Sequence, residues 1–256
     1  MAASSLPPEA PLVSVVVVTY QHAAYIERCL RSILEQRCTF AWELLVGEDG
    51  STDGTRAICE RLAAEFPDRI RLFLRERKDV LVIMGRPTGR ANLLALFNAA
   101  RGKYIAICEG DDHWIDADKL QLQVDAMEGE PSLSGCFTNA WNQRNGERED
   151  YYAHLQEHRP PRDTQAEDVV FRIGVPTCTI LFRRELIFPL HPAYYRSPVA
   201  DRILLAGLTA HGPLRFIDRF TGVREVHPGG IHSMKGELHD LKMKVAVVPF
   251  VDELSG

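Results

Sequence analysis

The densest group of acidic residues in the sequence follows an apolar segment. In "YIAICEGDDHWIDADKL" (104–120), Glu109, Asp111, Asp112, Asp116 and Asp118 lie within ten residues that contain no Lys or Arg. Carboxylates this close repel one another and raise one another's pKa, so a cation is their expected partner. Two adjacent carboxylates at a strand end suit a hard divalent ion that also binds substrate phosphates. We expect Asp111 and Asp112 to form such a site, and Asp116 and Asp118 to cap the helix that follows.

Apolar runs and amphipathic segments alternate through the first 130 residues. "LVSVVVVTY" (12–20) is a β-branched run, which is typical of a strand buried on both faces of a parallel sheet. The predicted strands are 12–20, 42–49, 69–76 and 103–109, and the predicted helices are 23–36, 51–67, 89–101 and 116–128. Four strand–helix units in a row predict an α/β fold with a doubly wound, Rossmann-like, mostly parallel sheet flanked by helices.

Polar residues stand where these predicted strands end. Ligands of such sheets bind beyond the carboxyl ends of the strands. This rule places Thr19, Tyr20, Glu48, Asp49 and the acids 109–112 on one rim. In "GEDGSTDGT", the Asp49 carboxylate is suited to accept a hydrogen bond from a base N–H or a ribose hydroxyl. Its neighbours Ser51, Thr52 and Asp53 have the residue types of a helix cap.

After residue 130 the strand–helix alternation changes. Segments 133–141, 178–184 and 213–220 are predicted strands, and 199–212 is a predicted helix. The polar stretch 142–170 is either a mobile loop or part of a substrate wall. The Gly- and Pro-rich segment 223–233 is a predicted loop. Residues 1–11 form a Pro-rich, disordered lead, and the tail 234–256 has no assigned role.

Composition narrows the function classes. The 256 residues carry a net charge of -5, so no general basic field is present to hold nucleic acid. Six cysteines without a C-x-x-C pair predict buried, reduced thiols in a cytoplasmic protein. The start lacks a secretory signal, and its longest apolar run is far shorter than the roughly 20 residues of a membrane span.

Three blocks together carry a family resemblance. "VSVVVVTYQHAAYIERCLRSILEQ", "ELLVGEDGSTDGT" and "GKYIAICEGDDHWIDADKL" resemble, in order and spacing, the nucleotide-sugar-binding half of glycosyltransferase family 2, with the GT-A fold, over residues 12–125. The resemblance implies a nucleotide-sugar-binding half at 12–130 and an acceptor-binding half of the same domain at 131–233. It also implies inverting transfer of one sugar from a UDP- or dTDP-sugar donor, with Mn²⁺ or Mg²⁺ as cofactor.

The resemblance also implies roles for residues of the donor half. The family's D-x-D motif matches 109–111, with Glu where many members have Asp, and Glu48 replaces the first acid of the common "DDGS". The resemblance implies that Thr19 and Tyr20 line the base pocket and that Asp49 binds uracil or thymine. It implies that Asn92 lies near the nucleotide and that Asp111 contacts the ribose. Asp112 and Glu109 are the implied metal ligands. Arg90, beside Asn92, is a phosphate partner by its chemistry.

The acceptor half matches the family less closely. The family's catalytic base is usually an Asp shortly before an apolar helix, and "SPVADRILLAGL" offers Asp201, with Arg202 where Trp is frequent. "VREVHPGGIHS" resembles a late family segment that would place Arg224 at the donor and His227 near the metal or diphosphate. Trp114 is assigned either to stacking on an acceptor ring or to packing. His22, His113 and His232 are assigned to the surface or to packing.

Other functions remain as alternatives. A nucleotidyltransferase that forms a nucleotide sugar would carry a Gly-rich, basic loop after the first strand, and "TYQHAAYIE" has neither Gly nor Lys. A non-catalytic nucleotide-sugar-binding protein would not need the acidic cluster. A dinucleotide-dependent oxidoreductase would need G-x-G-x-x-G after the first strand. The acceptor hydroxyl can belong to a glycan, a natural product or a lipid-linked molecule, and the sequence is compatible with a homodimer and with peripheral membrane contact.

Overall fold

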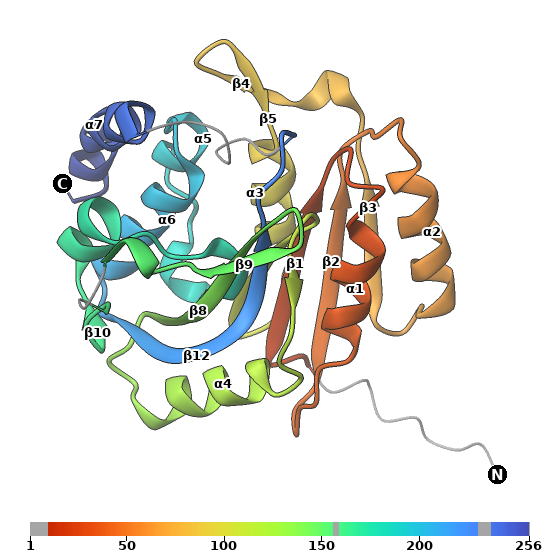
Figure 1. The fold of residues 1–256 in the computed structure, drawn as a ribbon, viewed down its shortest axis with the longest axis horizontal. Coiled ribbons are helices and arrows are strands. Elements are labelled where there is room, and N and C mark those ends of the chain that lie inside the picture. The colour runs from red at the N-terminus through yellow and green to blue at the C-terminus, as the bar shows by residue number, and fades with distance from the viewer. Residues whose placement is uncertain (1–9, 156–158, 230–236, 256) are drawn as a thin grey trace.

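The computed structural model describes residues 10–155, 159–229 and 237–255, which form a mixed α/β fold around one large sheet (Figure 1). The sheet has ten strands in the order β10-β12-β8-β11-β6-β1-β2-β3, with β7 paired to β12 and β9 to β8. The strands are β1 (Val13–Thr19), β2 (Trp42–Glu48), β3 (Ile70–Leu74), β6 (Tyr104–Glu109), β7 (His113–Trp114), β8 (Gly135–Arg144), β9 (Glu147–Asp150), β10 (Asp163–Thr164), β11 (Leu181–Arg183) and β12 (Leu214–Glu225). A separate hairpin pairs β4 (Leu81–Ile83) with β5 (Arg86–Thr88).

Helices cover both faces of the sheet (Figure 1). They are α1 (Ile26–Leu34), α2 (Thr55–Glu65), α3 (Arg90–Ala99), α4 (Lys119–Gly129), α5 (Ala193–Arg196), α6 (Ala200–Thr209) and α7 (Glu237–Ser255). Side chains of α1, α2 and α4 share one apolar cluster with one face of the sheet. Side chains of α3, α6 and α7 share the cluster on the other face. The predicted doubly wound architecture is therefore confirmed.

The first strand explains how the two layers are fixed. Val13, Val15 and Val17 pack into the α1 side of the sheet, whereas Val16 packs into the α3 side. Successive strand residues point to opposite faces, so a β-branched run buried on both faces needs helices on each. β1 pairs in parallel with β2 and β6, and its end places Thr19 opposite Glu48. The carboxyl ends of these three strands thus meet at one edge.

The sheet continues without a break into the later part of the chain. β11 runs antiparallel between β6 and β8, and β12 lies parallel beside β8. β12 extends to Glu225, beyond the predicted 213–220, because it pairs with β8 through two register irregularities. The first part of the predicted loop 223–233 is therefore strand. β8 also exceeds the predicted 133–141, because β9 pairs with its end and orders part of segment 142–170.

Some expectations fall outside the described residues. Most of the predicted lead, the segment 230–236 with His232, and the final residue belong to this group. The described part of the tail forms α7. All six cysteines are free thiols, and five of them are buried. Among the described residues, no helix combines the length and apolarity that crossing a bilayer requires.

Candidate active site

A cavity of about 680 Å³ opens at the carboxyl ends of β1, β2 and β6. Parallel sheets bind ligands at this edge, because the loops that leave the strands diverge there. Nine of the residues predicted from the sequence line it: Thr19, Tyr20, Asp49, Asn92, Glu109, Asp111, Asp112, Asp201 and Arg224. Residues from both halves of the chain therefore share one space.

An aromatic ring, a carboxylate and a guanidinium group lie in contact with one another in the lining of the cavity. Arg77 Nη1 donates to Asp49 Oδ2 at 2.7 Å, and the Arg77 guanidinium lies 4.0 Å from the centroid of the Tyr20 ring. Burial raises the pKa of Asp49, while the charge of Arg77 opposes that rise. Arg77 is not among the residues predicted from the sequence. It follows the end of β3, so the strand-end rule that selected Asp49 points to this region too.

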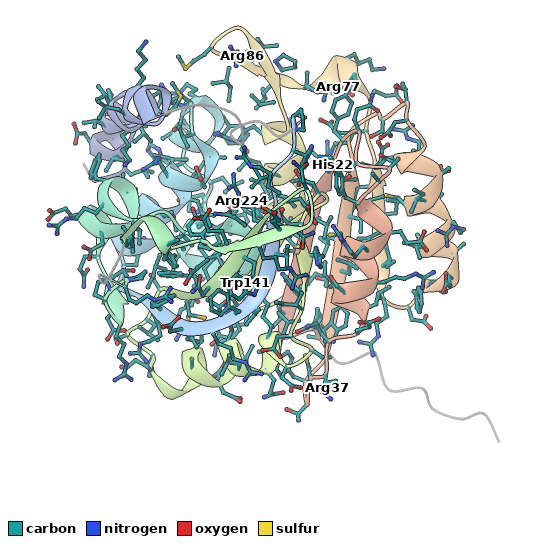
Figure 2. The ribbon with its side chains drawn as sticks, viewed as in Figure 1. His22, Arg37, Arg77, Arg86, Trp141 and Arg224 are labelled. Carbon is teal, nitrogen blue, oxygen red and sulfur yellow. The ribbon has the colours of Figure 1, made fainter. Side chains whose placement is uncertain are left out.

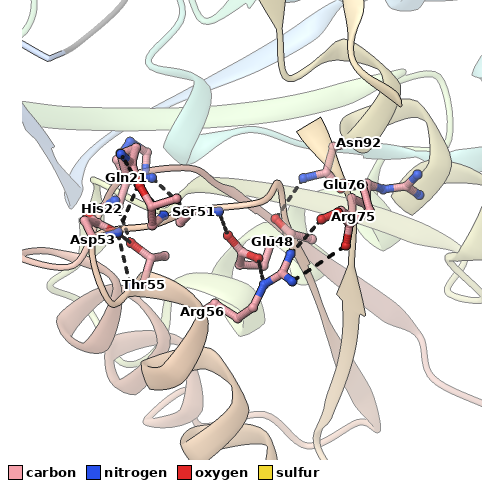
Figure 3. Close-up of polar contacts among 12 residues, drawn as sticks. Gln21, His22, Glu48, Ser51, Asp53, Thr55, Arg56, Arg75, Glu76 and Asn92 are labelled. Carbon is pink, nitrogen blue, oxygen red and sulfur yellow. Dashed lines mark hydrogen bonds and ion pairs between the residues drawn. The ribbon is translucent and has the colours of Figure 1, made fainter. Parts of the chain in front are cut away.

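Polar contacts hold the loop after β1 against the loop after β2 (Figure 3). Gln21 Oε1 accepts hydrogen bonds from the backbone N–H of Thr52 and Asp53, and the His22 N–H donates to Thr55 Oγ1. The N-cap position of α2 is Gly54, but Asp53 Oδ1 accepts from the N–H of Thr55, the first residue of the helix, as a capping side chain does. Ser51 and Thr52 contact Gln21 instead, so their expected capping roles are wrong.

Glu48, the acid that departs from the common family pattern, is fully buried. Its carboxylate accepts from the Ser51 N–H at 2.6 Å and from Arg56 Nε at 2.5 Å (Figure 3). A buried carboxylate with both oxygens engaged stabilises the turn and is not presented to a ligand. Glu48 therefore does not line the cavity.

The carboxylate of Asp111 lies between two histidines. His227 Nε2 is 3.1 Å from Asp111 Oδ2, and His22 Nε2 is 3.7 Å from the same oxygen. His227 follows β12, whereas His22 lies in the loop after β1. His22 was expected to be a surface or packing residue, and it instead lines the cavity. This arrangement makes Asp111 and His227 neighbours although 116 positions separate them.

Asp112 has a different environment. It is 6% exposed, and its Oδ1 accepts a hydrogen bond from the Glu225 N–H at 2.9 Å. Burial and the charge of Asp111 raise the pKa of Asp112 well above its ordinary value, and they raise the pKa of Glu109 to about 7. Glu109 Oε2 is buried and has no hydrogen-bond partner among the described residues. Asp111 thus faces a histidine, whereas one oxygen of Asp112 is engaged by the end of β12. The ribose contact of Asp111 and the metal contact of Asp112 stay predictions.

The remaining acids of the cluster, Asp116 and Asp118, form ion pairs with arginines of other segments. Asp116 Oδ2 lies 2.5 Å from Arg219 Nε, and Asp118 pairs with Arg37. Asp118 is the N-cap residue of α4, but its side chain makes no capping hydrogen bond. Among residues 10–155, 159–229 and 237–255, no group of three or more His, Cys, Asp or Glu side chains is placed to hold a metal ion by itself. A Mg²⁺-like ion is commonly bound through one or two carboxylates besides substrate phosphates and water, so the cavity-lining Asp111 carboxylate, with His227 beside it, fits such an ion.

The opposite side of the cavity comes from the later part of the chain. Asp201 lies in the first turn of α6, and its Oδ1 accepts from the Arg202 N–H at 2.8 Å. Asp201 and Arg202 both line the cavity, together with Arg224 at the end of β12. Figure 2 labels Arg224, Arg77 and His22 in the same region of the molecule. Arg224 Nη1 lies 3.3 Å from Asn142 Oδ1. The site thus combines a carboxylate and two guanidinium groups on the side that faces the strand ends.

Two polar residues of α3 have structural contacts. Arg90 is 5% exposed and does not line the cavity; its guanidinium donates to the carbonyl oxygens of Tyr194 and Ser197. The expected phosphate role of Arg90 is therefore wrong, because these contacts fix the segment before α6. Asn92 reaches the cavity, but its Nδ2 donates to the Gly47 carbonyl at 2.8 Å and its Oδ1 accepts from Arg75. A Cβ at Gly47 would lie 2.1 Å from Asn92 Oδ1, which explains the glycine in β2.

Trp114 packs in the core and does not reach the cavity. It is 3% exposed, its Nε1–H donates to the Cys178 carbonyl at 2.7 Å, and Lys119 Nζ lies 4.1 Å from its ring centroid. The acceptor-side assignment is wrong, and the packing alternative holds. A Trp beside acids resembles a sugar-stacking residue in sequence, but its place in β7 points it inward.

Comparison with known proteins agrees with this geometry. The profile described as "Glycosyl transferase family 2" matches residues 14–187. The Mycobacterium tuberculosis protein Rv1520, described as uncharacterized, is 30% identical over 181 residues, which cover 70% of this chain and 49% of that protein. The Escherichia coli enzyme WfgD, named a UDP-Glc:alpha-D-GlcNAc-diphosphoundecaprenol beta-1,3-glucosyltransferase, is 36% identical over 118 residues, which cover 45% of this chain and 41% of the enzyme. The chain thus spans about half the length of these curated relatives.

A solved structure supports the fold. The mannosyltransferase PcManGT from Pyrobaculum calidifontis, in complex with GDP-Man and Mn²⁺, superposes with a TM-score of 0.65 at 19% identity, covering 97% of this chain and 74% of that one. The architecture is therefore the GT-A fold. Given the match over residues 14–187 and the cavity at the strand ends, this chain belongs to glycosyltransferase family 2.

Proposed function

We propose that this glycosyltransferase is inverting and divalent-metal-dependent, and that it moves one sugar from a UDP- or dTDP-sugar to an acceptor hydroxyl. One observation carries the proposal. A single cavity of about 680 Å³ is lined by Asp49, Arg77 and Tyr20, by Asp111, and by Asp201. By their chemistry, these groups suit a base, a diphosphate and a reacting sugar, respectively.

The residues suited to the base support a pyrimidine donor. The Asp49 carboxylate accepts hydrogen bonds, as the ring N–H of uracil or thymine requires, and Arg77 beside it donates them to carbonyl oxygens. Tyr20 is 39% exposed and offers a ring face for stacking. Guanine is the competing base, since the similar PcManGT structure contains GDP-Man.

Asp111 and His227 are the residues that would hold Mn²⁺ or Mg²⁺. When bound, the ion neutralises the charge that develops on the diphosphate leaving group. Arg224, at the end of β12, adds a positive charge on the same side of the cavity. Asp112 accepts from the Glu225 N–H through one carboxylate oxygen, so it positions the strand end that precedes His227.

Asp201 is the proposed catalytic base. The acceptor oxygen forms a bond to the anomeric carbon while the bond from that carbon to the diphosphate oxygen breaks, and the acceptor proton passes to the Asp201 carboxylate. The leaving nucleoside diphosphate carries the electron pair of the broken bond. Attack from the face opposite the leaving group inverts the anomeric centre, by the logic of inverting glycosidases.

The proposed acceptor is a hydroxyl group of a glycan, a natural product or a lipid-linked molecule. WfgD is named for a lipid-linked acceptor, and this chain matches 41% of that enzyme. A cytoplasmic location and a homodimer are retained here as predictions from the sequence.

Donor hydrolysis tests the proposal directly. We expect the purified chain with Mn²⁺ to release nucleoside diphosphate slowly from a UDP- or dTDP-sugar, and faster once a suitable acceptor is added. GDP-sugars serve as the comparison. Release from GDP-sugars alone would overturn the pyrimidine assignment. Absence of binding and release for all three donor types, with Mn²⁺ present, would refute the proposed activity.

A further inference from the structure

A second imidazole lines the cavity beside His227. The His22 side chain is 18% exposed and lines the cavity, and its Nε2 lies 3.7 Å from Asp111 Oδ2, which is beyond hydrogen-bond range. Within the part of the chain that the structure describes, Nε2 has no hydrogen-bond partner, because the side-chain hydrogen bond of His22 is made through Nδ1. A ring nitrogen in this situation is available to a bound molecule.

Contacts elsewhere on the imidazole fix the orientation of His22. Thr19 Oγ1 lies 3.3 Å from His22 Nδ1. A Cβ at Gly110 would lie 2.6 Å from Thr19 Oγ1 and 3.0 Å from His22 Nδ1, so the glycine that follows β6 leaves room for this pair. The ring also meets the rings of Tyr25 and His227 edge-on, at centroid distances of 6.4 and 6.3 Å. These contacts therefore set the position of Nε2 in the cavity lining.

The backbone directly before His22 is strained. Gln21 has φ 57°, a left-handed conformation that is unfavourable for most residues other than Gly, Asn and Asp. Hydrogen bonds to the loop after β2 hold the chain there: the Gln21 N–H donates to Ser51 Oγ at 3.0 Å, and the His22 N–H donates to Thr55 Oγ1 at 2.8 Å (Figure 3). Strain of this kind clusters at functional sites, which supports a ligand-binding role for the residue that it orients.

The surroundings of the ring make Nε2 a hydrogen-bond donor. The Thr19 hydroxyl can donate its hydrogen to Nδ1, and in a neutral imidazole the other nitrogen then carries the ring hydrogen. The Asp111 carboxylate near Nε2 is an acceptor, so it favours the same tautomer. An anionic oxygen is therefore the ligand group that matches Nε2. A nucleoside diphosphate that binds beside Asp111 supplies such oxygens, and hydrogen bonds to them are stronger than those to neutral acceptors.

We propose that His22 is a donor-binding residue of this transferase, and that its Nε2–H donates to a phosphate oxygen of the bound nucleoside diphosphate. This inference rests on the proposed function, because it needs the diphosphate to lie beside Asp111. His22 then contacts the phosphates directly, whereas Asp111 and His227 act on them through the metal. The sequence assigned His22 to the surface or to packing, so this contact adds a residue to the donor side of the site.

Two substitutions test the contact by calorimetric UDP binding with Mn²⁺ present. An Asn amide takes the place of Nδ1, so His22→Asn keeps a partner for Thr19 and loses the group at Nε2. A Gln amide nitrogen reaches the place of Nε2, so His22→Gln keeps the donor. We expect His22→Asn to weaken UDP binding roughly ten- to a hundredfold, as for hydrogen bonds to charged groups, and His22→Gln to weaken it much less. His211→Asn, at an exposed histidine, is the control.

Two further measurements separate a phosphate contact from other roles of His22. Uridine carries no phosphate, so its affinity, measured by NMR titration, should be the same in His22→Asn and in the parent. A general distortion of the pocket would weaken uridine and UDP together. Electron spin-echo spectra of the Mn²⁺–UDP complex should show the same coupling to imidazole nitrogen in both proteins, because the inferred contact of His22 is to phosphate and not to the metal.

Several results would overturn the inference. They are unchanged UDP affinity in His22→Asn, equal loss of UDP and uridine affinity, equal weakening by His22→Asn and His22→Gln, or loss of an imidazole coupling to Mn²⁺ in His22→Asn. Each of them leaves the proposed function standing, because the parent still binds UDP. If the parent binds GDP in place of UDP, GDP and guanosine serve for the same comparison. If the parent binds no nucleoside diphosphate, the proposed function fails and this inference fails with it.

Discussion

The two sides of the cavity are built in different ways. On the donor side, Thr19 ends β1, and Asp49 and Asp111 follow β2 and β6; these strands pair in parallel, so strand order brings the three residues together. On the other side, Asp201 opens a helix and His227 follows the long strand β12. His227 reaches Asp111 across 116 positions of sequence.

This difference affects how each side is held. On the donor side, parallel ladders join β1 to β2 and β6, so pairing of the strands sets where their ends lie. On the other side, β12 pairs with β8, but the segments beyond the ladder are held by single side-chain contacts, such as Asp112 with the Glu225 N–H and Arg90 with the Tyr194 and Ser197 carbonyls. We therefore expect substitutions to separate chemistry, donor binding and stability along this division.

The largest effect is expected at Asp201. Asp201→Asn should lower the turnover of sugar transfer by roughly 10²- to 10⁴-fold, the usual contribution of a positioned general base. Donor affinity should stay unchanged, because the base pocket and the Asp111 region are intact. Steady-state transfer kinetics with calorimetric donor binding would measure both. Asp125→Asn, an exposed acid on α4, is the control; normal turnover of Asp201→Asn would remove Asp201 from the mechanism.

The next effect distinguishes Asp111 from Asp112. Asp111→Asn should weaken Mn²⁺-dependent nucleotide binding by about a hundredfold or more, since loss of an outer partner alone costs 10- to 100-fold. Chelation of the metal with EDTA should weaken nucleotide binding by the parent protein to the same extent as the substitution does, and it should change nucleotide binding by the Asp111→Asn variant little. Asp112→Asn should chiefly lower the unfolding midpoint. The reverse pattern in calorimetry, with the metal effect lost only in Asp112→Asn, would restore the role that the sequence motif suggested.

A smaller effect is expected in the base pocket. Asp49→Asn keeps the side-chain size and removes the charge, so UDP affinity should fall by roughly ten- to a hundredfold, as for hydrogen bonds to charged groups. Affinity for the metal should not change. Isothermal titration with UDP and GDP would measure this, with Asp68→Asn as an exposed control. Equal loss of both nucleotides would show that Asp49 does not select the base.

The smallest effect on binding is expected at Arg90. Arg90→Met leaves the Tyr194 and Ser197 carbonyls without their donor, at about 1–3 kcal/mol for each unsatisfied group. The unfolding midpoint should fall, while UDP affinity of the folded protein stays the same. Arg86→Met, exposed on β5, should leave both unchanged. A variant that loses UDP affinity but not stability would make Arg90 a phosphate ligand after all.

Much of the donor side was predictable from sequence. The alternation of apolar runs and amphipathic helices indicated the parallel sheet, and the strand-end rule then selected Asp49 and Asp111. Arg77 and His22 were missed, because loop residues acquire their roles from neighbours that the alternation does not specify. Trp114 was assigned to two roles, since burial of a residue between strands cannot be read from its type.

The sequence by itself determined the alternating elements, the acidic cluster after one strand, and the family resemblance over residues 12–125. These are local patterns, set by periodicity and residue type. Only the tertiary structure decided what surrounds the two adjacent acids, Asp111 and Asp112. Asp111 faces His227, whereas Asp112 accepts from the Glu225 N–H. Neighbours in the chain point to different surroundings, and those surroundings come from more than a hundred residues away.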